Sequence, residues 1–130
     1  MAAPAAFTEL MEISSQIEAA VVLDGDEIVA SSVVDETRSA TLAEAIRRLV
    51  EAAERSRAGL KQIEVTLPEG HVFVVREGRR LIGATTSPDP PSGLVLYDLR
   101  SCLAGLAAEG VAPGGSSRAK AEKARGDETQ

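Results

Sequence analysis

The sequence is poor in aromatic residues. Only 2% of its 130 residues are aromatic, namely Phe7, Phe73 and Tyr97, and tryptophan is absent. Proteins that bind single-stranded nucleic acids stack the bases on aromatic rings and follow the phosphates with a basic groove. This chain has few such rings and a net charge of -6, so we expect it to bind neither nucleic acid nor an anionic membrane surface. Its core must consist mainly of aliphatic side chains.

Cysteine and histidine occur once each, as Cys102 and His71. A single cysteine cannot form an internal disulfide, and one thiol with one imidazole is too small a set of ligands for zinc. A thiol nucleophile, Cys102, and an imidazole base, His71, would together form a conceivable catalytic pair. Cys102, however, lies on the apolar face of a predicted helix, so we interpret it as a buried structural thiol. The sequence therefore predicts no metal site.

Motifs for nucleotide binding and hydrolysis are missing. The chain has no glycine-rich loop followed by Lys-Ser or Lys-Thr, so it cannot bind nucleotide phosphates as a P-loop GTPase does. Acidic residues gather within positions 24–36, but their spacing is not that of an EF-hand, and we interpret them as the solvated end of a hairpin. No nucleophile, base and orienting residue form a recognisable set. We predict no catalytic residue, no bound cofactor and no enzymatic activity.

Long hydrophobic runs are missing as well. Residues 1–13 lack the basic start and the long apolar stretch of a secretory signal. No segment approaches the roughly 20 apolar residues that a bilayer-spanning helix needs. We therefore expect no membrane insertion and a cytoplasmic location.

The most informative segment that is present is residues 39–58, SATLAEAIRRLVEAAERSRA, which predict a long helix. Thr41 and Glu44 have the spacing of a capping box, and Gly59 follows the helix where a positive φ is favoured. Apolar residues cover roughly half of the helix circumference, more than the ~100° stripe needed to pack on one layer. The large ones can fill a sheet face, and the small ones beside them would let a second helix approach. A surface helix that is merely rich in alanine is the alternative interpretation.

Short β-branched runs surround this helix. The predicted strands are residues 19–23, 27–33, 60–67, 71–76 and 80–86. An Asp-Gly turn joins the first two into a hairpin, and further helices are predicted over residues 4–13 and 93–108. Because the first strand is apolar on both sides, helices must cover both faces of the sheet.

The expected fold class is therefore α/β (α+β), with three layers in an α/β/α arrangement. It has a single five-stranded antiparallel sheet, with one long helix on one face and two helices on the other. The elements follow the order α-ββ-α-βββ-α. Residues 1–112 form one predicted domain, and residues 113–130 have no large apolar side chain and are expected to form a disordered polar tail.

The strand within residues 60–67 alternates apolar and polar residues, which is typical of a sheet edge, and it directly follows the long helix. A two-fold related copy could pair with that edge while the two helices pack together, which would form one self-complementary interface. Charges at Lys61 and Glu64 could instead discourage such pairing. The predicted dimer interface consists of Ala45, Leu49, Ala52, Ser56, Ile63 and Val65.

The other side of the long helix carries alternating charges. As i,i+4 ion pairs they would contribute only about a few tenths of a kcal/mol each and keep the helix soluble. The alternative is a strip that docks a partner and sets its orientation and association rate. The predicted partner-docking residues are Glu44, Arg47, Arg48, Glu51 and Arg55.

Three stretches carry a resemblance to a known family: LMEISSQIEAAVVLDGDEIVASS at residues 10–32, the Ala/Leu-rich helix at 42–53, and GLVLYDLRSCLAGLA at 93–107. With the order of elements, they resemble the Roadblock family, the dynein light-chain type domain also found in bacteria and archaea. The resemblance spans roughly residues 7–108. The family's usual glycine near the start of the first strand is absent, and Glu18 and Ala19 stand in that region.

The resemblance implies that residues 1–112 form a Roadblock-like domain that dimerises with itself or with a sibling Roadblock protein through a continuous sheet. Bacterial relatives act beside small Ras-like GTPases as regulators or scaffolds in signalling, so it also implies a GTPase partner. A small-molecule sensing module is the alternative, because sheets with helices on both faces also occur in ligand-binding sensors. Gly83 and Ala84 are the only hint of space for a ligand.

Overall fold

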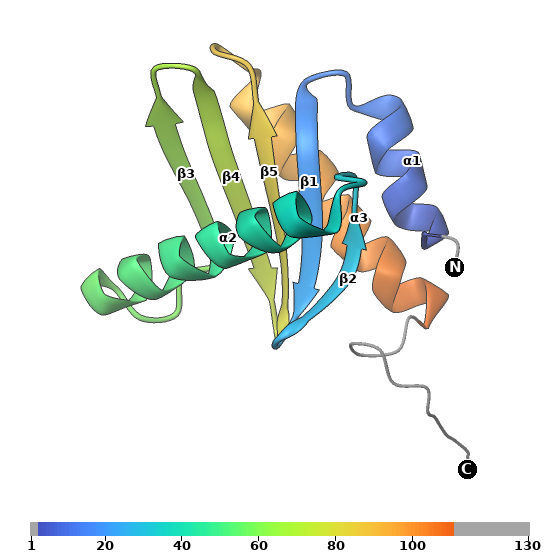
Figure 1. Cartoon of the computed structure of the whole chain (residues 1–130), viewed down its shortest axis with the longest axis horizontal. Helices are drawn as coiled ribbons and strands as arrows, with labels where there is room; N and C mark the ends of the chain where they lie inside the picture. The colour runs from blue at the N-terminus through green and yellow to red at the C-terminus, as the bar shows by residue number, and fades with distance from the viewer. Residues whose placement is uncertain (1–2, 111–130) are drawn as a thin grey trace.

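The computed structural model describes residues 3–110, and its elements follow the predicted order (Figure 1). They are α1 (Ala5–Ile13), β1 (Ile17–Asp24), β2 (Glu27–Ser31), α2 (Glu36–Ser56), β3 (Gln62–Leu67), β4 (Gly70–Glu77), β5 (Arg80–Thr86) and α3 (Ser92–Glu109). The predicted polar tail at 113–130 lies outside the described residues. Among the helices described, none combines the length and the apolarity needed to cross a membrane.

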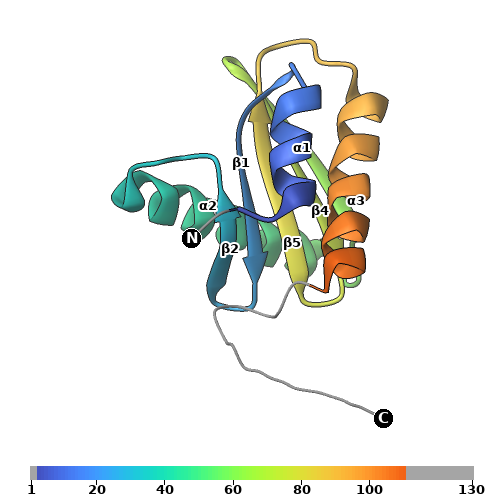
Figure 2. The same cartoon turned by 90° about the vertical axis from the view of Figure 1, so that its right-hand side faces the viewer.

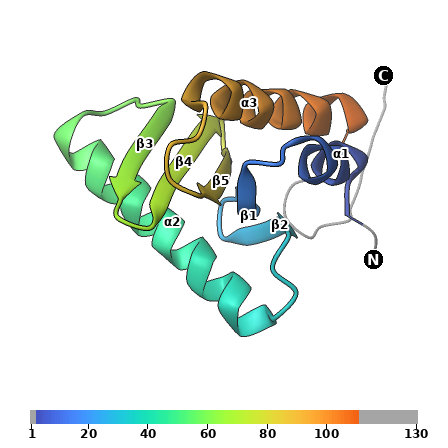
Figure 3. The same ribbon diagram turned by 90° about the horizontal axis from the view of Figure 1, so that it is seen from above.

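The strands form a single five-stranded antiparallel sheet in the order β2-β1-β5-β4-β3. β3 is an edge strand, as its alternating pattern predicted. β1 is buried on both faces, because Ala20 and Val22 belong to one hydrophobic cluster whereas Val21 and Leu23 belong to the other. Figure 3 shows the resulting layers, with α2 below the sheet and α1 and α3 above it. The predicted three-layer fold is confirmed.

The helices α1 and α3 lie side by side on one face of the sheet (Figure 2). The Glu109 carboxylate at the end of α3 accepts hydrogen bonds from the backbone N–H groups of Ala5 and Ala6, each at 2.9 Å. The first N–H groups of a helix have no partner within it, and Pro4 provides no side-chain cap here. The last turn of α3 therefore caps the first turn of α1.

The helix α2 runs across the strands on the opposite face (Figure 1). Ile46 lies so close to Gly83 that a β-carbon on this glycine would be 2.6 Å from the Ile46 Cδ1 atom. The absence of a side chain at Gly83 therefore permits close packing of α2 on the sheet. Ala84, the next residue, faces the α1 and α3 layer.

The long helix begins earlier than predicted. Asp35 is its N-cap, and the Asp35 carboxylate accepts a hydrogen bond from the Arg38 backbone N–H at 3.1 Å. The predicted capping box is wrong, because Thr41 lies inside the helix and donates its hydroxyl proton to the Thr37 carbonyl at 3.0 Å. Residues 36–38 are polar and fall outside the apolar repeat on which the predicted boundary was based.

Candidate functional site

The predicted dimer residues all lie on α2 or on the side of β3 that faces α2. Ala45, Ala52 and Ser56 are exposed, and Leu49, Ile63 and Val65 are half-buried. Leu49 and Ile63 pack against the same hydrophobic cluster beneath the helix. The fold thus brings an exposed flank of small residues on α2 (Ala45, Ala52 and Ser56) beside the apolar side of the edge strand.

One row of the sheet next to this flank is only partly covered. It consists of the paired residues Ala19, Thr85, Val72 and Val65, one from each of four neighbouring strands. All four are half-buried. In the adjoining row, by contrast, Ile46 of α2 packs onto Gly83. We call the four residues the uncovered row.

Among the described residues, β3 has a strand partner on one side only, which is β4. The polar face of β3 is attached to α3, since Gln62 Oε1 accepts a hydrogen bond from Arg100 Nη1 at 2.7 Å and Glu64 Oε2 accepts one from the Ser92 hydroxyl at 2.9 Å. The same Glu64 oxygen lies 3.3 Å from His71 Nδ1. Because these contacts turn Glu64 toward α3, they hold the strand in place without blocking its apolar side.

The predicted docking residues differ in their exposure. Glu44, Arg48, Glu51 and Arg55 are exposed along α2, whereas Arg47 is half-buried. Glu44 and Arg48 form an i,i+4 ion pair with 3.2 Å between Oε2 and Nε. Two nitrogens of the Arg47 guanidinium, Nε and Nη2, are shielded from solvent and form no hydrogen bond within residues 3–110. Four of the five residues therefore present an accessible charged strip, which we call the α2 strip.

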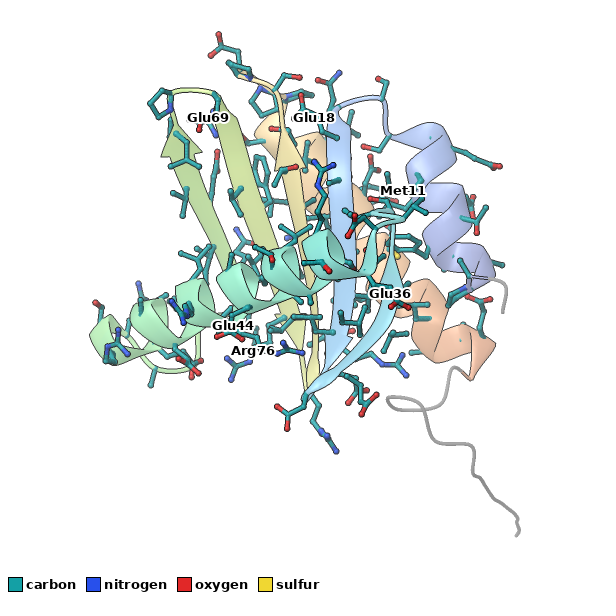
Figure 4. All side chains as sticks on the ribbon, in the orientation of Figure 1. Met11, Glu18, Glu36, Glu44, Glu69 and Arg76 are labelled. Carbon is teal, nitrogen blue, oxygen red and sulfur yellow. The ribbon has the colours of Figure 1, made fainter. Side chains whose placement is uncertain are left out.

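A second ion pair on α2 attaches the helix to the sheet. Arg76 on β4 lies beside α2 (Figure 4), and its Nη1 is 2.5 Å from Glu54 Oε2. The pair joins residues that are far apart in sequence, so no local pattern predicts it. Since both side chains are about one-third exposed, we expect the pair to orient the helix more than to stabilise it.

The structure keeps the only thiol away from the only imidazole. Cys102 is buried on the inner side of α3, and its burial, together with the nearby negative charge of Glu109, raises its pKa to about 11. His71 is on β4, where its ring stacks on Phe73 and contacts Glu64. Such a thiol stays protonated near neutral pH and is a poor nucleophile. Within residues 3–110, no three His, Cys, Asp or Glu side chains are grouped to hold a metal ion.

The space suggested for a small ligand is filled. Ile46 occupies the side of Gly83 that faces α2, and Ala84 is fully buried in the cluster beneath α1 and α3. Neither residue therefore opens a cavity, and the small-molecule sensing hypothesis loses the feature that suggested it.

Two features of the structure were not predicted from the sequence. Val72 belongs to the uncovered row, which depends on where α2 crosses the sheet. Asp98 is a buried carboxylate between α1 and α3. A signal for Asp98 was present in the sequence, since it follows Val95 by three residues and precedes Cys102 by four, on the apolar side of the helix.

No protein-family model matches the chain, and no curated protein matches it in sequence. Solved structures do match. A Roadblock/LC7 domain from Streptomyces avermitilis superposes with a TM-score of 0.64 at 15% identity, over 81% of this chain and 94% of that one. Gliding protein MglB from Thermus thermophilus gives 0.64 at 14% identity, over 79% and 84%. Myxococcus xanthus MglB gives 0.64 at 12% identity, over 87% and 92%. The chain therefore has the Roadblock/LC7 fold, as the resemblance in its sequence implied.

Proposed function

We propose that the chain is a dimeric, non-enzymatic adaptor of the Roadblock type that binds a small Ras-like GTPase in the cytoplasm. One observation supports the proposal most strongly: the small-residue flank of α2, the uncovered row and the unpaired edge of β3 lie together on one face. A contiguous apolar area next to an unpaired strand is typical of an interface.

A second copy fits this face. If two β3 strands pair antiparallel across a two-fold axis, the two sheets become continuous and both α2 helices lie on the same side. Ala45 and Ala52 are small enough to let the helices approach, and the contact would cover Val65. A sibling Roadblock protein with a similar flank would bind in the same way.

The α2 strip supports the second half of the proposal. Exposed charges of both signs can set the orientation and the association rate of a partner. Beside them, small side chains leave a shallow, open hollow on the outer side of the helix, which includes Thr37, Ala40, Thr41 and Ala45. Because the chain has no P-loop of its own, the nucleotide would belong to the partner.

The test is a binding measurement with purified Ras-like GTPases from the same organism, each loaded with GTP or GDP. We expect the full chain to bind one loaded form. A charge exchange in the α2 strip, Glu51→Lys with Arg55→Glu, should weaken that binding by about tenfold, or about 1.4 kcal/mol. The net charge stays unchanged.

The control is Asp26→Lys, which reverses an exposed charge in the turn between β1 and β2, away from the α2 strip and from β3. It should leave the affinity within about twofold, since isolated surface charges contribute little. The proposal fails if neither loaded form of any GTPase binds, or if the control weakens binding as much as the exchange on α2.

A further inference from the structure

The seam between α1 and α3 contains a groove on the face of the molecule opposite α2. Its volume is about 130 Å³, and it is lined by Ala6, Glu9 and Ile13 from α1 and by Asp98, Ser101 and Gly105 from α3. The two helices lie side by side in Figure 2, with the start of α1 next to the end of α3. The buried residues Leu10 and Cys102 also line the groove, so both helices contribute to it.

Asp98 is unusual for a buried acid. Only 9% of its surface is exposed, and its carboxylate makes no hydrogen bond or ion pair with any of residues 3–110. Asp24, the other buried acid, faces Arg79 and Arg80 at 3.5 and 3.2 Å. The Asp98 oxygens are not among the side-chain atoms that are fully shielded from solvent, so the carboxylate is accessible from the groove that it lines. A cationic group that enters the groove can therefore pair with it.

The surroundings of the groove fit a basic segment that also carries short apolar side chains. Glu9 and Glu12 are exposed on α1, and the helix has no basic residue. Around the groove, Ile13 and Tyr97 are each 63% exposed and Leu94 is 54% exposed. Ile13 is the last residue of α1. An acidic groove beside exposed apolar side chains is typical of a binding site for a peptide.

The chain itself contains such a segment. Residues 116–125, SSRAKAEKAR, carry Arg118, Lys120, Lys123 and Arg125 against the single acid Glu122. Asp98 lies about 18 Å before the end of α3 at 1.5 Å per residue, whereas the extended residues 111–118 can span about 26 Å. Pro113, Gly114 and Gly115 come between the helix and the basic residues. The segment is long enough to return to the groove.

We propose that a basic side chain of residues 118–125 binds the Asp98 carboxylate of the same chain, so that the tail occupies the α1/α3 groove. The contact is an ion pair in a partly desolvated site, which makes it stronger than a pair on the open surface. It leaves the α2 face free, so it does not rest on the proposed dimer or on GTPase binding.

The test uses NMR on the full chain. The wild type is compared with a neutral-tail variant, in which Arg118, Lys120, Lys123 and Arg125 are replaced by Gln. All four substitutions lie outside the described residues 3–110. We expect the amide signals of Ser101 and Gly105 to shift between the two proteins. In the wild type, about 1 M NaCl should cause the same shift, because the Debye length is then about 3 Å.

Two further variants separate the Asp98 contact from general charge effects. Asp98→Asn, which keeps the shape of the side chain, should reproduce the shift and should raise the mobility of residues 118–125 in heteronuclear relaxation. Glu69→Gln, which removes an exposed acid far from the groove, should do neither. Tyr97 is the only tyrosine in a chain without tryptophan, so its fluorescence gives an independent readout beside the groove.

Three results of these experiments test whether the tail occupies the groove. If the groove amides of the wild type and the neutral-tail variant coincide, the proposal is overturned, even if an added synthetic basic peptide binds there, since the occupant would then be another protein. If Asp98→Asn leaves the tail as ordered as in the wild type, Asp98 is not the anchor and the proposal is equally overturned. If a peptide of residues 116–125, added to the neutral-tail variant, restores the wild-type signals, the assignment of the occupant is supported.

Discussion

Ile46 on α2 lies directly over Gly83 on β5. A β-carbon on Gly83 would lie 2.6 Å from Cδ1, 2.8 Å from Cγ1 and 3.1 Å from Cγ2 of Ile46. Because three atoms of one buried side chain would be too close, a small rotation of Ile46 cannot relieve the contact. The distance between α2 and the sheet therefore depends on the absence of a side chain at position 83.

We expect Gly83→Ala to lower the free energy of unfolding by about 1–3 kcal/mol, the usual cost of overpacking a core. Urea denaturation measures the change. Gly93→Ala is the matched control, since nothing lies within 4 Å of a β-carbon at that site in the first turn of α3, and it should be neutral or slightly stabilising. Adding Ile46→Val to Gly83→Ala should recover part of the loss. An unchanged Gly83→Ala protein would contradict the close packing.

Asp24, at the end of β1, forms ion pairs with Arg79, just before β5, and with Arg80, at the start of β5. These pairs connect the β1–β2 turn to the β4–β5 turn. Asp24 is 4% exposed, with Oδ2 3.2 Å from Arg80 Nε and Oδ1 3.5 Å from Arg79 Nε. Asp24→Asn removes the charge of a buried ion pair, so the free energy of unfolding should fall by about 1–3 kcal/mol. The exposed Asp26 lies in the same hairpin, and Asp26→Asn should change stability by less than about 0.5 kcal/mol. Equal losses for the two variants would show that the pairing is unimportant.

The thiol of Cys102 should make stability depend on pH in the alkaline range. Burial raises its pKa from the ordinary 9.0 to about 11 in the folded chain. Between these values the unfolded chain has lost the thiol proton while the folded chain retains it, so the unfolded state binds fewer protons and stability falls as pH rises. The stabilising contribution is complete below pH 9.0 and is lost toward pH 11.

The measurement compares the wild type with Cys102→Ala by urea unfolding at neutral pH and at about pH 10, because other groups titrate in both proteins and cancel in the difference. The wild type should lose more stability than the variant on going to the higher pH. In the folded wild type, thiol reagents should react slowly near neutral pH. Parallel pH profiles would mean that the thiol is not buried in solution.

The proposed dimer predicts a change of mass on mutation. Ala45→Arg with Ala52→Arg places two charged side chains where the second helix would pack, so light scattering coupled to size exclusion should show a monomer where the wild type is a dimer. Ala104→Arg with Ala107→Arg adds the same charge at exposed sites of α3 and should leave the dimer intact. A wild-type monomer at micromolar concentration, or a double variant of unchanged mass, would remove the basis of the proposed interface.

Most of the fold could be predicted because its signals are local. Alternation in residues 60–67 identified the edge strand, and two apolar faces in residues 19–23 identified a strand covered on both sides. Helix boundaries were less accurate. The true cap at Asp35 precedes polar residues that carry no periodic signal, so the predicted start was placed inside the helix.

The residues of the candidate site could also be predicted only in part. Periodicity showed which α2 residues are small and which are charged, but it does not say which neighbours cover them. The half-buried state of Arg47, the ion pair between Arg76 and Glu54 and the incomplete cover of Val72 all follow from where α2 crosses the sheet. That crossing depends on contacts between residues far apart in the chain.

The sequence by itself determined the order of elements, the two-sided sheet and the excess of small and apolar residues on one helix, because each depends on side chains within a few positions of one another. Only the tertiary structure decided that Gly83 receives Ile46 and that Asp98 lies in a seam where none of residues 3–110 pairs with it. Burial and pairing are properties of distances between separate elements, and hydrophobic packing sets those distances only when the whole domain folds.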